Sequence, residues 1–242
     1  MDGIATQAGM IAGSGGGTTF PAPTHYWDLD TTGFVDSAGG WTLTQNDGTV
    51  TIDATGGPDG GLAAHLNPVG EELIRVGGEY WDGVQDNLTV SIWAKIDNFS
   101  STGNWLFSWR GAAPNDQLIQ VFVYSSGGIR AAIFNTSGTF YPADSTTTAT
   151  TGNWYHITAT HDGSNLKIYV NGVLEDTTPT PAFDYSNQLM PLALGAGSWT
   201  LGNNGLAHDG MLAKCGVWDV ALTGSEINTL YNSGNGLNYA DL

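Results

Sequence analysis

Apolar and polar side chains alternate with a period of two in the middle of the chain, through residues 154–173. At the start of this stretch Tyr155, Ile157 and Ala159 share one face, and the residues between them share the other. A run of turn-forming residues follows, and the alternation then resumes. β-Branched and aromatic residues in this pattern predict two antiparallel strands. The Asn-Gly pair at 171–172 predicts a tight turn with two positive φ angles, which leads into a third strand.

Two other stretches extend this pattern. Apolar residues occupy every second position of 88–96, and residues 210–218 are typical of a buried strand. After the second stretch, Thr223 and Glu226 have the spacing of a helix capping box, and apolar residues follow at helical spacing. The sequence therefore predicts one short C-terminal helix, with Gly234 as its stop, in a chain that is otherwise all-β.

The segments between the strands carry further predictions. Residues 41–44 and 49–52 are predicted to form two short strands, and the Asn-Asp-Gly between them predicts a hairpin. The Thr-rich segment 144–151 is interpreted as a polar loop. The first nineteen residues consist largely of Gly, Ala, Ser and Thr, a composition typical of flexible coil. We therefore divide the chain into an extended N-terminal arm, 1–19, and one domain, 20–242.

Composition and charge narrow the functional class. A chain of 242 residues can bury the core of one large β-sandwich. It carries 23 acidic and 6 basic residues, and a net charge of −17 repels nucleic acid and anionic lipid. This charge leads us to expect no nucleic-acid partner. Neither a signal peptide nor an apolar run of about 20 residues occurs, so we also expect no membrane span. Cys215 is the sole cysteine, and we expect it to be a buried, unreactive residue.

Three motifs carry a family resemblance. N-W-Y-H-I-T-A-T-H-D-G at 153–163, followed by L-K-I-Y-V-N-G at 166–172, resembles the signature hairpin of laminin G-like, concanavalin A-like domains. L-T-V-S-I-W-A-K at 88–95 is similar to another strand of that family, and residues 210–231 resemble its closing strand and helix. Together the motifs span about Tyr26 to Tyr231. The resemblance implies an antiparallel jelly-roll β-sandwich that serves in extracellular recognition or adhesion.

The same resemblance raises the questions of catalysis and of calcium. The related fold also hosts glycoside hydrolases, but their paired-carboxylate motif, E-x-D-x-x-E, is absent here, so we expect no enzyme. Many laminin G-like domains bind calcium at the rim of the sandwich. No cofactor is expected to be required, and calcium is left open with Asp162 and Asp209 as weak candidate ligands. The family's acidic residue in the closing strand is replaced here by Ala213.

Aromatic residues in loops are the candidates for stacking on sugar rings, because ring stacking is the usual physics of lectin sites. Five of the tryptophan and tyrosine residues fall in predicted loops, and they are Trp81, Trp105, Tyr141, Tyr185 and Trp199.

Three hypotheses for the function follow. The first is a non-enzymatic virion surface protein, a capsid decoration or appendage subunit, because the chain combines an unusual arm with a recognition fold and no export signal. The arm would dock onto other virion or capsid subunits in an oligomeric assembly, through Ile4, Met10, Ile11 and Phe20. The alternative is a carbohydrate-binding lectin or adhesion module, such as a phage tail-fibre domain, that binds surface polysaccharide. The third is a polysaccharide hydrolase with an atypical site.

Overall fold

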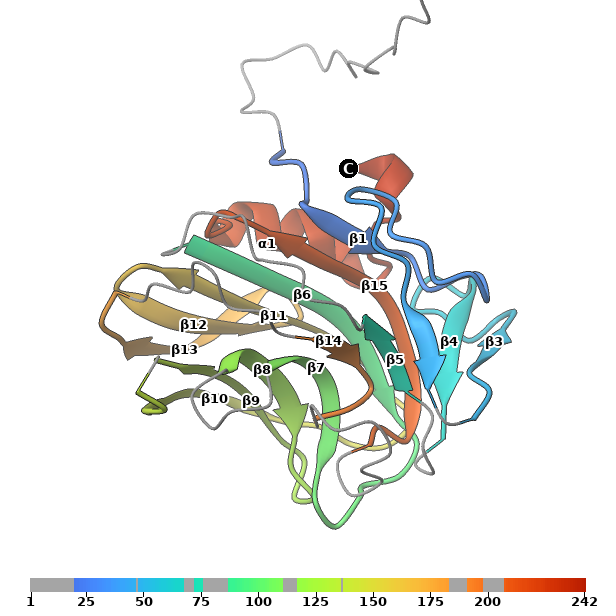
Figure 1. The fold of residues 1–242 in the computed structure, drawn as a ribbon, viewed down its shortest axis with the longest axis horizontal. Helices are drawn as coiled ribbons and strands as arrows, with labels where there is room; N and C mark the ends of the chain where they lie inside the picture. Colours follow the sequence, from blue (N-terminus) through green and yellow to red (C-terminus); the bar gives the residue numbers. More distant parts are fainter. Residues whose placement is uncertain are drawn as a thin grey trace, which may run out of the picture.

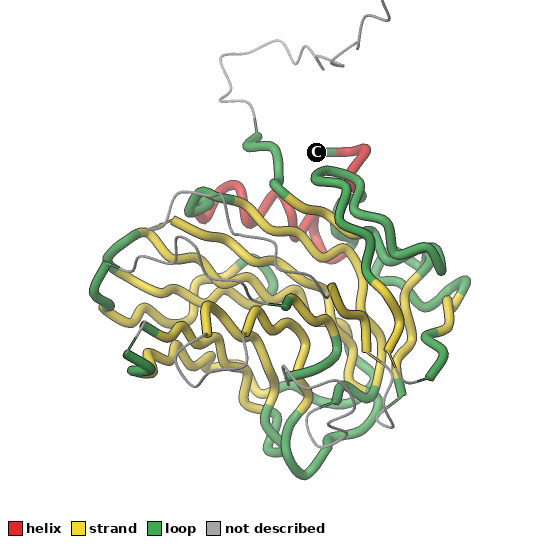
Figure 2. Tube along the Cα trace, viewed as in Figure 1, coloured by secondary structure: helices red, strands yellow, loops and turns green. Residues whose placement is uncertain are grey.

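The chain folds into two antiparallel β-sheets that pack face to face, with one short α-helix at the C-terminal end (Figures 1 and 2). The computed structural model describes residues 20–46, 48–67, 72–75, 87–110, 117–135, 137–182, 191–197 and 207–242. Within these ranges the structure is almost entirely strand, and the predicted all-β jelly-roll sandwich with a short C-terminal helix is confirmed.

Sheet A has the strand order β13-β12-β11-β6-β15-β4-β3, and β1 also pairs with β15. Its strands are β1 (His25–Trp27), β3 (Thr51–Asp53), β4 (Ala63–Leu66), β6 (Asn87–Ile96), β11 (Trp154–Asp162), β12 (Asn165–Val170), β13 (Val173–Pro179) and β15 (Gly210–Trp218). Sheet B has the order β10-β9-β8-β7-β14-β5-β2. Its strands are β2 (Thr44–Asn46), β5 (Glu72–Arg75), β7 (Asn104–Arg110), β8 (Gln117–Val123), β9 (Gly128–Phe134), β10 (Phe140–Thr148) and β14 (Leu192–Leu194).

The apolar face of each predicted strand lies in the core between the sheets. Ile92 of β6 and Ile157 of β11 are paired across the sheet, and both are fully buried in one large cluster. The β12–β13 hairpin turns at Asn171 and Gly172, whose φ angles of 52° and 79° confirm the predicted turn. Cys215 of β15 is also buried in this core, and burial raises the pKa of its thiol. It therefore behaves as a small apolar residue, as predicted.

Helix α1 (Gly224–Tyr231) begins as the sequence predicts and ends slightly earlier. Glu226 N–H donates to Thr223 Oγ1 at 3.3 Å, and Thr223 N–H donates to Glu226 Oε2 at 2.6 Å, which completes the capping box. The C-cap is Asn232, with φ 45°, instead of the predicted stop at Gly234. Asparagine tolerates the left-handed conformation that this position requires. Two short 3₁₀ turns follow, η1 (Asn232–Gly234) and η2 (Tyr239–Asp241).

Two predictions about connections were wrong. Residues 41–52 do not form a hairpin, because β2 pairs with β5 in sheet B whereas β3 pairs with β4 in sheet A. The Asn-Asp-Gly signal is local, whereas the partner strands β5 and β4 come from later parts of the chain. Residues 144–151 are not all loop, because β10 continues to Thr148. Its threonines suit an edge strand with one solvated face.

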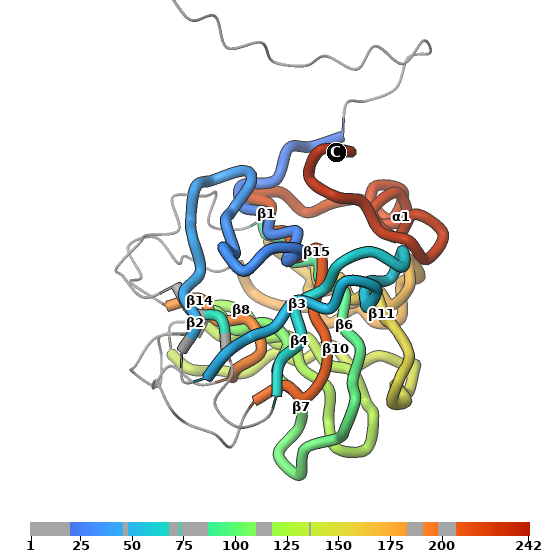
Figure 3. Tube along the Cα trace, turned by 90° about the vertical axis from the view of Figure 1, so that its right-hand side faces the viewer, coloured from blue at the N-terminus to red at the C-terminus, as the bar shows by residue number. Residues whose placement is uncertain are grey.

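The outer face of sheet A is covered by other parts of the chain. The ring of Tyr231, from α1, stacks on Trp93 with centroids 5.8 Å apart. Trp154 Nε1 donates to the Gly56 carbonyl at 2.9 Å, so the loop between β3 and β4 covers the neighbouring area. Figure 3 shows α1 and the C-terminus on the same side of the molecule as the first described residues. All nine residues of β15 are consequently buried.

Sheet B differs along β10, its edge strand, which lies beside β13 of sheet A. Along β10, most residues are exposed or half-buried, and Ala143 is the fully buried exception. The described part of the chain holds no helix with the length and apolar character needed to cross a membrane. On the outer side of sheet B, Phe140 and Asp144 of β10 are exposed.

Candidate functional site

Side chains with binding chemistry line up on the outer side of sheet B. In β9, Ile129, Ala131 and Ile133 point into the core, so Arg130 and Phe134 point outward. The strand register then sets their neighbours in β10, because Arg130 is paired with Asp144 and Phe134 with Phe140. On the other side, Phe122 of β8 is paired with Arg130. Alternation and register thus bring residues from three strands into one surface.

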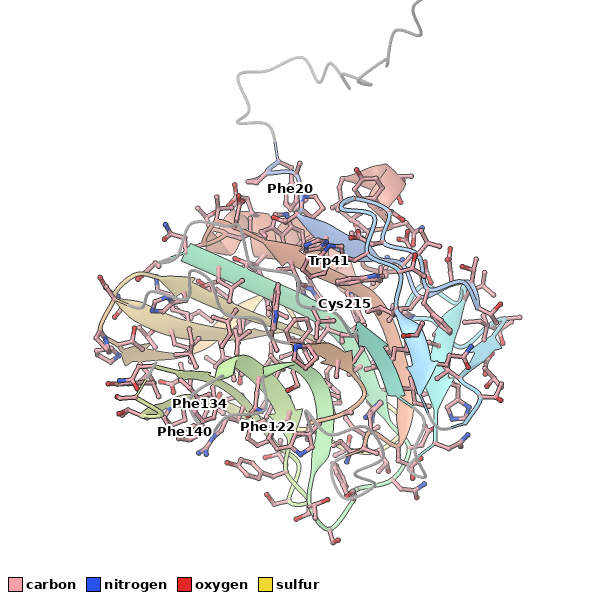
Figure 4. The ribbon with its side chains drawn as sticks, in the orientation of Figure 1. Phe20, Trp41, Phe122, Phe134, Phe140 and Cys215 are labelled. Atoms are coloured by element: carbon pink, nitrogen blue, oxygen red, sulfur yellow. The ribbon has the colours of Figure 1, made fainter. Side chains whose placement is uncertain are left out.

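We call this surface the outer aromatic face, and it consists of Tyr124, Arg130, Phe134, Phe140 and Asp144. The Arg130 guanidinium lies 5.0 Å from the Tyr124 ring centroid and 5.4 Å from that of Phe140. The Phe140 ring in turn lies 5.1 Å from the Phe134 ring. Figure 4 shows Phe134 and Phe140 close together on this side of the molecule, with Phe122 beside them. Three rings and one guanidinium therefore form a continuous row.

Ion pairing holds the guanidinium in place. Arg130 donates from Nε to Asp144 Oδ1 at 2.5 Å and from Nη2 to Asp144 Oδ2 at 2.6 Å. This two-pronged geometry orients the flat guanidinium between the two rings. The Asp144 side chain is 51% exposed and the Phe140 residue 39% exposed, so both are accessible from solvent. The face thus combines apolar ring surface with hydrogen-bonding groups at its border.

Buried aromatic residues support the row from the centre of the sheet. The Phe122 ring stacks on Trp105 with centroids 4.4 Å apart, and it contacts Tyr124 edge to face at 5.1 Å. A side chain at Gly197 would meet the Trp105 ring at 2.1 Å, so glycine is needed there for backbone to lie against the indole. Among the described residues, the buried Trp105 Nε1 finds no hydrogen-bond partner. Trp105, a predicted stacking residue, is therefore joined to the outer aromatic face through Phe122.

Two other predicted binding residues, Tyr141 and Phe20, do not join this face. Tyr141 is next to Phe140 in sequence but packs against the core, because neighbours in a strand point to opposite sides. Phe20 packs edge to face on Trp218, with centroids 6.3 Å apart, on the covered side of sheet A. Six predicted residues lie outside the described residues, and they are Ile4, Met10, Ile11, Trp81, Tyr185 and Trp199.

Sequence reasoning missed all five residues of the outer aromatic face, because it sought binding residues in loops. A usable signal was present in β9. Arg130 is one of only six basic residues in the chain, and it stands at an outward position of an alternating strand. A charged residue at such a position, four residues before the outward Phe134 and on the same face of the strand, marks a face that is open to solvent.

The two candidate calcium ligands have other partners. Asp162 Oδ1 accepts hydrogen bonds from the N–H groups of Ser164 and Asn165, and its Oδ2 lies 2.7 Å from Lys167 Nζ. Asp209 Oδ2 accepts from Asn98 Nδ2 at 3.0 Å. Across the described residues, no group of three or more His, Cys, Asp or Glu side chains is arranged to hold a metal. The surroundings of Asp162 are therefore those of a turn and an ion pair.

A buried serine–histidine pair is structural. Ser91 Oγ lies 2.7 Å from His156 Nε2, the separation of a nucleophile and its base. Both residues are nearly inaccessible, and the imidazole packs against Trp93 and Tyr231, with ring centroids 5.1 Å and 6.1 Å away. Burial lowers the pKa of His156 to about 3. A substrate cannot reach this pair in the folded structure, so we assign it to the packing of sheet A under α1.

Comparison with solved structures agrees with this architecture. Domain 4 of AbnA, a GH43 extracellular arabinanase from Geobacillus stearothermophilus, solved in complex with arabinotriose, has a TM-score of 0.66 at 20% identity. The match covers 86% of this chain and 97% of that domain. The ligand-binding domain of botulinum neurotoxin serotype D, solved with N-acetylneuraminic acid, gives 0.65 at 15% identity and covers 89% of this chain.

The binding domain of Paraclostridial Mosquitocidal Protein 1 has a TM-score of 0.66 at 16% identity, over 88% of this chain. This chain spans about half of the two toxin domains, 54% and 52% of their lengths. No curated protein matches the sequence. A laminin G-type family model, described as the concanavalin A-like lectin/glucanases superfamily, matches residues 70–228. The chain therefore belongs to the concanavalin A-like lectin/glucanases superfamily.

Proposed function

We propose that this chain is a carbohydrate-binding module and that its ligand packs on the outer aromatic face. The observation that carries the proposal is the continuous row of Tyr124, Arg130, Phe140 and Phe134, which ends in the exposed ring of Phe140. The outer side of sheet A is covered by α1 and its neighbours, which leaves sheet B for the ligand. Two structures of similar fold contain a bound sugar, which supports the same ligand class.

The chemistry of the face suits a sugar ring. A pyranose or furanose presents C–H groups on its flat side and hydroxyl groups around its rim. Flat aromatic surface accepts the C–H side, and polar groups placed beside it can bond the hydroxyls. Here Phe134 and Phe140 supply the surface, while Asp144 supplies exposed acceptor oxygens beside them.

We propose further that the module is not an enzyme. Retaining and inverting glycosidases act with two carboxylates on the substrate face. Strands β7, β8, β9, β10 and β14 together contain a single carboxylate, Asp144, and it is paired with Arg130. A second catalytic acid would have to come from elsewhere in the chain.

Replacing Phe140 with alanine is expected to weaken polysaccharide binding by about tenfold, which corresponds to about 1–2 kcal/mol of lost stacking and apolar contact. Binding would first be detected on a glycan array, with and without calcium, and then quantified by titration calorimetry. The matched control is Tyr239→Ala, because Tyr239 is an aromatic residue of similar exposure, 37% against 39%, on the far side of the molecule.

Equal affinity in Phe140→Ala and the parent protein would contradict the assignment of this face. A loss of binding in Tyr239→Ala as well would indicate that truncating any exposed ring disturbs the fold. Circular dichroism of both variants separates that effect from a local loss of contact.

We also propose that the module is displayed on a virion surface, docked through its N-terminal arm. Phe20, the first described residue, packs against Trp218 beside Leu242 in one cluster, so the arm leaves the domain next to the C-terminus and away from the outer aromatic face. Such an arrangement would let the arm bind neighbouring subunits while the sugar-binding side stays outward.

Deletion of residues 1–19 is expected to abolish incorporation into particles and to leave the domain folded, because Phe20 and all described contacts are retained. Immunoblots of purified particles would measure incorporation, and thermal melting would measure folding. Normal incorporation of the truncated protein would refute the docking role of the arm.

A further inference from the structure

We infer that the ligand of the outer aromatic face is a neutral polysaccharide, not one built from uronic or sialic acids. This inference rests on the proposed sugar-binding function and specifies the substrate class. Its starting point is the charge of the face itself. Strands β8, β9 and β10 contain one cation, Arg130, and one anion, Asp144. Arg130 donates two hydrogen bonds to the Asp144 carboxylate.

The paired guanidinium is poorly placed to recognise a sugar carboxylate. Two-pronged recognition of a carboxylate needs two parallel N–H groups of the guanidinium. In Arg130 one such pair, Nε and Nη2, already donates to Asp144, so a second carboxylate could use only the remaining N–H groups beside Asp144. An anionic ligand would have to displace Asp144 or approach it against like-charge repulsion. A neutral sugar does not have to displace Asp144 and is not repelled by it. Its C–H side would pack on the rings, and its hydroxyl groups would donate to the exposed carboxylate oxygens.

Neighbouring groups add further negative charge. Glu175 and Asp176 lie on β13, the edge strand of sheet A that faces β10. Asp176 Oδ2 accepts from the N–H of Asp144 at 2.9 Å, and Glu175 Oε2 accepts from the N–H of Thr147 at 2.8 Å. Two carboxylates thus border the face directly. The chain as a whole carries a net charge of −17, which also opposes the approach of a polyanion.

The row of rings is longer than one sugar. From Trp105 on β7 through Phe122 to Phe140 on β10 the stacked groups cross four neighbouring strands, about 14 Å at the usual strand spacing. The accessible part is the half formed by β9 and β10. That accessible half is about one strand spacing wide, so we expect it to hold about one sugar ring.

Affinity gel electrophoresis of the full chain tests this inference. The neutral probes are linear arabinan, xylan, β-glucan and galactomannan, and the anionic probes are polygalacturonate, alginate and polysialic acid. We expect at least one neutral polymer to retard the protein, with retardation unchanged between about 20 and 300 mM NaCl because no ion pair forms with the ligand. The anionic polymers should leave its mobility unchanged at either salt concentration.

The variant Asp144→Asn provides the matched test of the charge argument. It frees the Arg130 guanidinium, so we expect binding to polygalacturonate to rise by about tenfold, the scale of one charge-assisted hydrogen bond. Salt-sensitive retardation of the parent protein by an anionic polymer, lost in Arg130→Gln, would overturn the inference and leave the proposed sugar-binding function intact. Retardation by none of the seven polymers would overturn the proposed function, and the inference with it.

Discussion

Replacing Asp36 with alanine is expected to lower the free energy of unfolding by about 3–5 kcal/mol. The Asp36 carboxylate is buried between β1 and β2. Four backbone N–H groups donate to it at 2.9–3.0 Å, from Tyr26, Ala38, Gly39 and Trp41. His25 Nδ1 lies 2.6 Å from its Oδ2. Alanine would leave these donors without partners, and buried unpaired N–H groups are costly.

The loss should extend to the packing around this loop. The His25 ring is stacked on Trp41 at 3.8 Å, and Trp41 in turn contacts Trp109 of sheet B. Urea denaturation at pH 7 would measure the effect. Asp30→Ala is the matched control, because Asp30 is an exposed acid of the same loop and should change stability by no more than about 0.5 kcal/mol. An equally small effect at Asp36 would show that the loop contributes little to stability.

Lowering the pH from 7 to 5 is expected to destabilise the fold by about 2 kcal/mol for each of two buried histidines. Burial lowers the pKa of His156 to about 3 and that of His208 to about 4. Once unfolded, each takes up a proton near pH 6.5. Because the unfolded state then binds more protons than the folded state, stability falls as the pH drops below about 6.5 and continues to fall until the folded pKa is reached.

The prediction is tested by comparing how the free energy of unfolding changes with pH in the parent protein and in the histidine variants. The comparison does not require the proteins to be equally stable at pH 7. In His156→Gln the loss between pH 7 and 5 should fall from about 4 to about 2 kcal/mol, and His208→Gln should behave in the same way. Asp36 does not contribute in this window. Burial alone would raise its pKa, but the hydrogen bonds from His25 and the backbone lower it, so its stabilisation is lost only below about pH 4. An unchanged slope in both histidine variants would contradict the prediction.

Most of the fold could be predicted because its signals are local. Alternation in 88–96 and 154–170 assigned each side chain to the core or to the outer face, and the structure confirms this for Ile92 and Ile157. Turn chemistry at Asn171 and the capping box at Thr223 depend on residues within four positions of each other. Such short-range preferences do not depend on the rest of the chain.

Pairing between distant segments was harder to predict. A hairpin over residues 41–52 was predicted, but β2 and β3 join different sheets because their partners, β5 and β4, are supplied by later parts of the chain. The segment 144–148 was interpreted as loop because its residues are polar. Its pairing to β9 and its hydrogen bonds to Glu175 and Asp176 make it a strand.

The sequence by itself determined the sandwich architecture, the single C-terminal helix and the acidic surface, because alternation, capping and composition are properties of neighbouring residues or of sums over the chain. Only the tertiary structure decided which side of the sandwich is exposed to the ligand that we propose. That choice depends on α1 covering sheet A and on a register that sets Arg130 against Asp144 and Phe134 against Phe140. Both arise from contacts between segments far apart in the chain, which no local pattern encodes.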